Sequence, residues 1–159
     1  MKKNFRMVTM AYLIFLSAVL GAMLYAGIVV MAVTFHTEAW LGTDLLTRFQ
    51  EGQIMTENFL RLSYLVNVMI VVVAFYEGYK FKKFERDTVT QVATFFVLAT
   101  ALLFSQYYLP DILSMQQQGE AVTKSVAFLN THKGSEINSK ILALALLVLI
   151  VQNMRKACK

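Results

Sequence analysis

The sequence contains two histidines, and both are candidate ligands of a metal ion. His36 follows the first long apolar run, and His132 lies four residues before Glu136. On a helix this spacing places two side chains on one face, so His132 and Glu136 could bind one ion together. Glu57 completes the predicted set of metal ligands. Imidazole and carboxylate groups suit zinc, and also copper, iron or nickel, so the predicted cofactor is a divalent metal.

Three more polar side chains near these residues are candidates for binding a small ligand: Glu38, Arg61 and Asn67. Two other interpretations stay open. In the first, Glu57–Arg61 and His132–Glu136 are ion pairs that end helices at the membrane surface and bind nothing. In the second, His36 and His132 are the axial ligands of a b-type haem. Haem ranks below the metal, because haem ligands in membrane reductases usually lie deeper within a span.

Other chemistries have no sequence signal. The chain has one cysteine, Cys158, so it can form no internal disulfide and no cysteine-based metal motif. A phosphate-binding glycine loop, a nucleophile elbow and an HExxH pattern are also absent from the sequence. The sequence therefore favours a protein that is not an enzyme.

The composition places these residues in an integral membrane protein. Hydrophobic residues make up 57% of the chain and charged residues 16%, whereas a soluble domain has about 45–50% apolar residues. A soluble globule of 159 residues could not bury so much apolar surface. We therefore expect one integral membrane domain over residues 1–159, with the lipid bilayer as its first partner.

Four apolar runs predict an all-α, four-transmembrane-helix bundle with up-down topology. The spans cover about residues 7–35, 58–76, 89–109 and 134–151, and Pro110 is expected to end the third. Apolar sequence in the first run continues well past its small residues, which favours an uncleaved span over a signal peptide. In such a bundle the first and fourth helices are neighbours, which would bring His36 and His132 together.

The two outer connections, residues 36–57 and 110–136, are long for a small bundle. Each carries apolar residues at helical spacing, so amphipathic segments are expected to lie in the headgroup region or to fold over the outer mouth as a lid. These apolar residues are Leu45, Leu46 and Phe49 in the first connection, and Val122, Val126 and Leu129 in the second.

The charges predict the orientation. Ten basic and three acidic residues lie in the N-terminal segment, the loop assigned to residues 77–87 and the C-terminal tail, whereas the outer side has five basic and seven acidic residues. Positive charge flanking spans faces the cytoplasm, so both termini are expected there, in a cell inner membrane. The same distribution explains the net charge of +5 without a nucleic-acid partner.

Small residues recur every four positions in the first span, at Ala18, Ala22 and Ala26. Such a stripe lets helices approach closely in lipid, either within the bundle or in a homo-oligomer. A structural or accessory subunit bound to another membrane protein is the alternative function. The predicted span interiors contain almost no ionisable residue, which argues against a proton-driven transporter with a midplane carboxylate.

A loose resemblance covers roughly residues 15–110. It rests on Gly21-Ala22-Met23-Leu24-Tyr25, the run from Val30 to Phe35, and the outer connection that leads to Phe59 and Tyr64. With these features the chain resembles an uncharacterised family of small four-helix inner-membrane proteins that carry a domain of unknown function. That family is related to a eukaryotic transmembrane protein implicated in platinum-drug resistance. The resemblance implies the fold and a membrane location, and it implies no activity.

Overall fold

The computed structural model describes residues 3–43, 45–83 and 87–157. This part of the chain is helical and contains no strand. Four of its helical segments are long and apolar enough to cross a membrane, which confirms the predicted all-α fold with four spans. They are Phe5–Thr34, Arg48–Lys82, Thr88–Gln117 and Val126–Ala157.

These segments comprise 30, 35, 30 and 32 residues, whereas about 20 residues cross a bilayer. The second, third and fourth segments extend past the predicted spans at the end away from the termini, and the second and fourth also extend at the other end, to Lys82 and Ala157. Much of the two predicted outer connections is therefore a continuation of the spanning helices. The capping box formed by Thr47 and Gln50 explains why the second helix begins at Arg48.

The first segment consists of α1 (Lys3–Leu24), a π-helical turn (Tyr25–Val30) and α2 (Met31–Thr34). The second is the single helix α4 (Arg48–Lys82), and the fourth is the single helix α8 (Val126–Ala157). The third consists of α5 (Thr88–Leu102), a π-helical turn (Leu103–Tyr108) and α6 (Leu109–Gln117). The short helices α3 (Thr37–Leu41) and α7 (Glu120–Thr123) lie in the two outer connections.

Pro110 does not end the third helix, contrary to the prediction. It lies in the first turn of α6, directly after the π-helical turn Leu103–Tyr108. A proline ring inside a regular α-helix clashes with the carbonyl group four residues earlier. A π-helical turn widens the helix at this place, and the chain continues without the break that the sequence predicted.

The described residues of the two predicted outer connections form no continuous amphipathic helix. Leu45 and Leu46 lie in the non-helical stretch before α4, and Phe49 belongs to α4 itself. Val122 is on α7, whereas Val126 is the first residue of α8. The predicted helices over these apolar residues are therefore present mainly where they continue a spanning helix, at Phe49 in α4 and at Val126 and Leu129 in α8.

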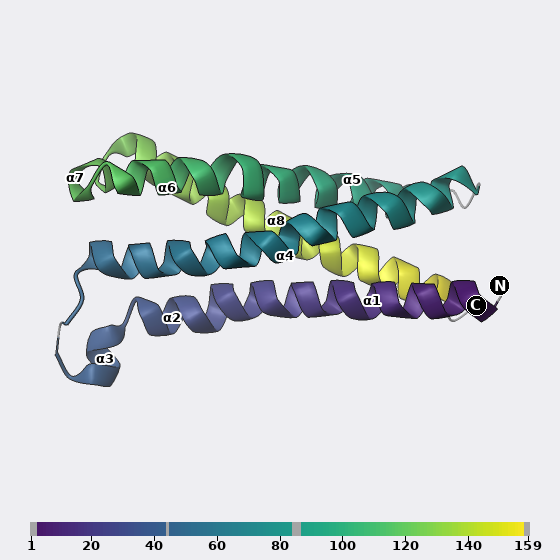
Figure 1. Ribbon diagram of the computed structural model, residues 1–159, viewed down its shortest axis with the longest axis horizontal. Helices are drawn as coiled ribbons and strands as arrows, with labels where there is room; N and C mark the ends of the chain where they lie inside the picture. Colours follow the sequence, from purple (N-terminus) through teal and green to yellow (C-terminus); the bar gives the residue numbers. More distant parts are fainter. Residues whose placement is uncertain (1–2, 44, 84–86, 158–159) are drawn as a thin grey trace.

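The helices form an up-down bundle in which α1 packs against α4 and α8, and α5 packs against the same two helices. Both chain ends lie at one end of the bundle, which we call the terminal end, and α3 and α7 lie at the other, the connection end (Figure 1). The core is a layer of fully buried apolar side chains from all four long helices. It includes Leu16, Val19, Val66, Met69, Val73, Val97, Leu142, Leu146 and Leu149.

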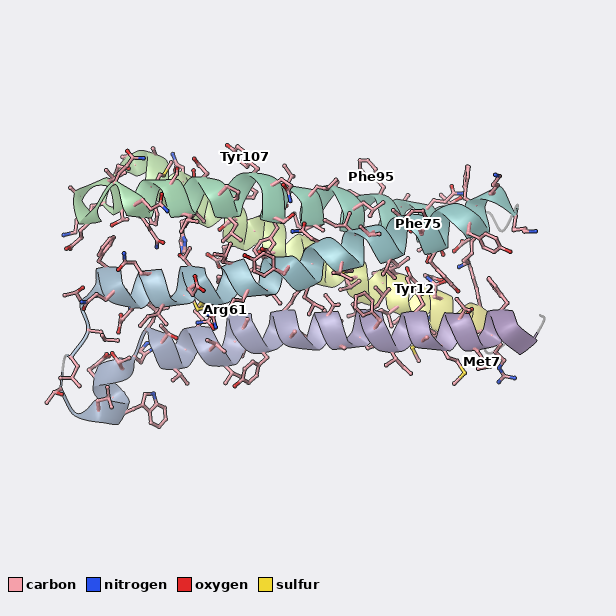
Figure 2. The ribbon with its side chains drawn as sticks, in the orientation of Figure 1. Met7, Tyr12, Arg61, Phe75, Phe95 and Tyr107 are labelled. Carbon is pink, nitrogen blue, oxygen red and sulfur yellow. The ribbon has the colours of Figure 1, made fainter. Side chains whose placement is uncertain are left out.

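Lipid-facing positions carry large apolar side chains, as a membrane location requires. Figure 2 shows Met7, Phe95 and Tyr107 pointing away from the bundle and Tyr12 turned into it. Within the stripe of small residues, Ala18 is exposed and Ala26 is buried, so the stripe does not form one contact surface inside the bundle.

Candidate functional site

The predicted metal ligands lie at the connection end, each in a local contact of its own. His36 lies between α2 and α3, with its Nδ1 atom 2.9 Å from the carbonyl oxygen of Ala32. The imidazole of His132 stacks on the ring of Phe128, one turn earlier on α8, with 6.0 Å between ring centroids. Both imidazoles are in exposed residues.

The predicted acidic ligands form ion pairs with cations on their own helices. Glu136 accepts a hydrogen bond from Lys140 at 2.6 Å, and Glu57 accepts one from Arg61 at 2.9 Å. Glu38 is exposed on α3. Asn67 accepts a hydrogen bond of 3.3 Å from Gln106. Of the two ion pairs in the pairing interpretation, Glu57–Arg61 is present, whereas Glu136 pairs with Lys140 in place of His132.

Residues 126–157 are helical, as the His132–Glu136 spacing requires, but the ligand set does not converge. The first and fourth spanning helices are neighbours as predicted, through α1 and α8. However, α8 crosses the bundle obliquely, so its first half lies beside α6 and α7, away from α2 and α3 (Figure 1). Across the described ranges, no group of three or more His, Cys, Asp or Glu residues could hold a metal ion.

A different polar site lies inside the terminal end of the bundle. Glu77 and Lys80 are on the last turns of α4, and their side chains are only 7% and 5% exposed. Both residues were expected in a cytoplasmic loop. That expectation is wrong, because α4 continues to Lys82 and carries the two charges into the bundle.

Glu77 connects three helices. Its Oε1 atom accepts hydrogen bonds from the hydroxyl of Tyr12 on α1, at 3.0 Å, and from Nδ2 of Asn153 on α8, at 2.8 Å. Its Oε2 atom lies 3.4 Å from the ammonium group of Lys80. Three donors, of which one is a cation, therefore contact this buried carboxylate.

Lys80 closes the network. Its ammonium group donates to Oδ1 of Asn153, so the amide bridges the cation and the carboxylate. The same ammonium lies 5.4 Å from the ring centroid of Tyr76. Every buried side-chain nitrogen or oxygen in the described residues has a hydrogen-bond partner. We call Tyr12, Glu77, Lys80 and Asn153 the buried charged network.

Aromatic and hydroxyl contacts extend the network along α1. The rings of Tyr12 and Tyr76 stack with 3.8 Å between centroids, and the hydroxyl of Tyr76 donates to Oγ1 of Thr9 at 2.8 Å. Since Tyr12 and Thr9 are each only 4% exposed, α1 and α4 are joined by polar contacts inside an apolar interface.

A second polar cluster lies at the terminal end, where α5 begins. Asp87 is the N-cap of α5: its carboxylate accepts hydrogen bonds from the backbone and the hydroxyl of Thr90. Lys156 on α8 lies 3.2 Å from the same carboxylate. The hydrogen bond from the Thr90 hydroxyl, followed by that from Lys156, lowers the pKa of Asp87 from 3.8 to about 2.

The buried face of α4 carried a sequence signal for the network. Glu77 and Lys80 continue the spacing of three and four residues that relates Val66, Met69 and Val73. Asn153 continues the same spacing after Leu149 on α8. Residues in phase with a core stripe belong to the core face of the helix, even where they are charged.

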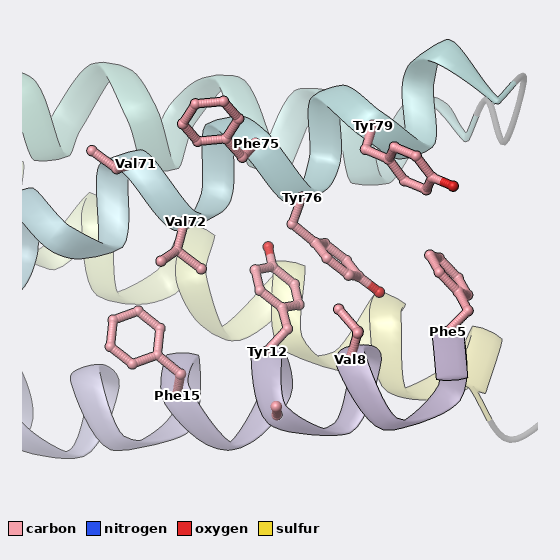
Figure 3. Close-up of a pocket in the computed structure, with 10 residues that line it drawn as sticks. Phe5, Val8, Tyr12, Phe15, Val71, Val72, Phe75, Tyr76 and Tyr79 are labelled. Carbon is pink, nitrogen blue, oxygen red and sulfur yellow. The ribbon is translucent and has the colours of Figure 1, made fainter. Parts of the chain in front are cut away.

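Two hollows adjoin the network. One, of about 390 Å³, lies between α4 and α5 and is lined by both Glu77 and Lys80. The other is an apolar groove of about 850 Å³ between α1 and α4, with Tyr12 and Tyr76 among its lining residues (Figure 3). We call them the polar pocket and the apolar groove.

The fold and this site define an integral, multi-pass membrane protein with a charged network inside its helix bundle. The chain belongs to the family described as a domain of unknown function (DUF4149), whose model matches residues 14–121. This match confirms the predicted membership of an uncharacterised family. No curated protein and no solved structure matches the chain.

Proposed function

We propose that the protein is a non-enzymatic protein of a cell inner membrane that binds a small organic ligand in the polar pocket. The observation that supports this proposal is the Glu77–Lys80 ion pair, which lies inside the bundle and also lines the pocket. Ionisable residues within membrane helices are costly and usually serve a function. A neutral hydrogen-bonded pair would join the helices at a lower desolvation cost.

The lining of the polar pocket indicates the chemistry of the ligand. Ala74, Gly78, Phe81, Phe95 and Leu98 supply an apolar wall, and Thr90, Gln91 and Thr94 supply neutral polar groups. Glu77 and Lys80 add one charge of each sign. A volume of about 390 Å³ falls in the range of small-molecule sites, which combine apolar walls with a few convergent polar groups. We expect an organic molecule with an apolar body and an ionised group.

Native mass spectrometry of the protein in mild detergent tests this proposal. We expect a small adduct on the wild type, distinguished from phospholipid by its fragments. Ala74→Trp fills the polar pocket and should abolish the adduct. The matched control is Ala18→Trp, which adds the same side chain at an exposed position on α1 and should retain it. A wild type without an adduct, or an adduct that survives in Ala74→Trp, would contradict ligand binding in this pocket.

The orientation is part of the proposal. The terminal end carries the basic segments, and this supports cytoplasmic termini by the positive-inside rule. The relation to the eukaryotic protein implicated in platinum-drug resistance stays a prediction that rests on the resemblance over residues 15–110.

The metal ion or haem at the connection end also stays a prediction, with a separate test. Total metal per chain can be measured by elemental mass spectrometry. A near-stoichiometric metal that disappears in His36→Ala or His132→Ala would establish that site, and iron would point to haem. Metal at background level in the folded protein would assign both histidines to the membrane surface. Co-purification of another membrane protein would instead support the role of an accessory subunit.

A further inference from the structure

The apolar groove runs along the outside of the α1–α4 interface and faces the surroundings of the bundle. Its sides are formed by the exposed residues Val8, Val71 and Phe75, and Phe75 is 77% exposed. The stacked rings of Tyr12 and Tyr76 lie between them. Figure 3 shows Phe5 and Tyr79 at one end of the groove and Phe15 with Val72 at the other.

The length of the groove matches one leaflet of a bilayer. Phe5 and Phe15 are ten residues apart on a helix, which corresponds to about 15 Å at 1.5 Å per residue. The hydrocarbon core of a bilayer is about 30 Å thick, so the groove has the length of the acyl region of one leaflet. The Phe5–Tyr79 end is at the terminal end of the bundle and would therefore lie at the level of the headgroups.

That end of the groove is basic. Lys83 lies with its ammonium 5.7 Å from the ring centroid of Tyr79, which lines the groove. Lys82, at the end of α4, is also exposed. It lies one helical turn after Tyr79, on the side of α4 that lines the groove. An apolar groove of leaflet length that ends at exposed cations is complementary to a lipid with a negatively charged headgroup.

We propose that the apolar groove is a binding site for one anionic phospholipid, with an acyl chain between α1 and α4 and its phosphate beside Lys82 and Lys83. This site is separate from the polar pocket, which lies between α4 and α5. The lipid covers the apolar rim that the bundle leaves exposed, and the two cations select the headgroup. Each interfacial cation contributes about a factor of five to the affinity for anionic lipid.

Quenching of tryptophan fluorescence by brominated lipids tests the site in the full chain. The single native tryptophan, Trp40, is replaced by phenylalanine, and Phe75→Trp places a reporter in the groove. Ile14→Trp is the matched control, because Ile14 is 69% exposed on α1 near the depth of Phe15 but does not line the groove. Each protein is measured in mixed phosphatidylglycerol–phosphatidylcholine vesicles in which one lipid or the other is brominated.

We expect the quenching of Phe75→Trp to show a preference of the groove for phosphatidylglycerol over phosphatidylcholine of at least about fivefold. This preference should be smaller in high salt. At Ile14→Trp the two lipids should quench according to their mole fractions. Lys82→Gln combined with Lys83→Gln should remove the preference at Phe75→Trp. These two side chains are on the exposed surface, so the double substitution should leave thermal unfolding unchanged.

Three results would overturn the proposal. Equal quenching by the two lipids at Phe75→Trp would show that the groove does not select the headgroup. The same preference at Ile14→Trp would show a general attraction of anionic lipid to the bundle. Protection of Phe75→Trp from both lipids would show that a second copy of the chain or another protein covers the groove.

Discussion

The hydroxyl of Tyr12 donates a hydrogen bond of 3.0 Å to the carboxylate of Glu77, 65 residues later in the chain. The bond crosses the interface between α1 and α4 inside the terminal end of the bundle. Asn153 on α8 donates a second hydrogen bond to the same carboxylate, at 2.8 Å. One charged group therefore fixes the relative positions of three helices at the end where the chain has its basic segments.

The Glu77–Lys80 pair should show strong energetic coupling. Lys80→Met leaves the carboxylate of Glu77 without its cation, and Glu77→Leu leaves a buried ammonium without its carboxylate. Removing one partner of a buried ion pair costs about 3–5 kcal/mol. Replacing both by apolar residues removes both desolvation costs, so the double variant should be less destabilised than either single variant.

Reversible unfolding in one detergent gives the free energies for this double-mutant cycle. Glu57 and Arg61 provide the control cycle, because they form an exposed pair with side chains 53% and 75% accessible. Their coupling should be below about 1 kcal/mol. Additive effects at Glu77 and Lys80 would contradict the interpretation of these residues as a buried pair.

Tyr12→Phe tests the hydrogen bond across α1 and α4. The variant keeps the ring that stacks on Tyr76 and removes only the hydroxyl that binds the carboxylate. Hydrogen bonds to charged groups contribute about 1.5–3 kcal/mol, and we expect a loss of that size in the free energy of unfolding. Tyr64→Phe is the matched control, since Tyr64 is 64% exposed on α4. Equal unfolding midpoints for the two variants would mean that the Tyr12 hydroxyl does not stabilise the bundle.

The four spans and the neighbouring positions of the first and fourth helices were predictable from the sequence, because apolar runs determine the spans and the first and fourth helices of an up-down bundle are neighbours. The ends of the helices were not. Hydropathy decreases where Glu77 and Lys80 occur in α4. A prediction from apolar residues therefore ends the helix before Glu77, whereas α4 continues to Lys82. The position of Glu77 in phase with Val73 carried the missing information.

The predicted proximity of His36 and His132 depended on a related assumption. Adjacent helices were taken to be adjacent along their whole length, which would have joined His36 to His132. The oblique path of α8 separates the two helices at the connection end (Figure 1). Crossing angles depend on how side chains interlock between helices, and the apolar pattern of one sequence does not give them.

The N-cap of α5 should make stability depend on pH in the acid range. The pKa of Asp87 is about 2 in the folded protein and ordinarily 3.8. A lowered pKa means that the folded state favours the charged carboxylate, so the stabilisation is complete above pH 3.8 and is lost as the pH falls toward about 2. Asp87→Asn keeps an effective cap and cannot titrate, so it should remove this part of the acid loss.

Thermal unfolding between neutral pH and the folded-state pKa of Asp87 measures the effect. Asp111→Asn is the control: Asp111 accepts a hydrogen bond from Thr131 at the connection end, and the variant should keep the loss that Asp87 causes. An Asp87→Asn protein with the acid profile of the wild type would contradict the role given to this carboxylate.

The orientation of the bundle gives the last prediction. With the basic segments in the cytoplasm, alkaline phosphatase fused after Lys159 should be inactive, because this reporter folds only in an oxidising compartment. The same reporter inserted at Gly119 should be active, since Gly119 lies between α6 and α7 at the connection end and has a positive φ of 106°. Reporter activity after Lys159 with none at Gly119 would show that the bundle has the opposite orientation in the membrane. The Glu77–Lys80 network would then lie beside the outer surface. The anionic lipid of the groove would then belong to the outer leaflet.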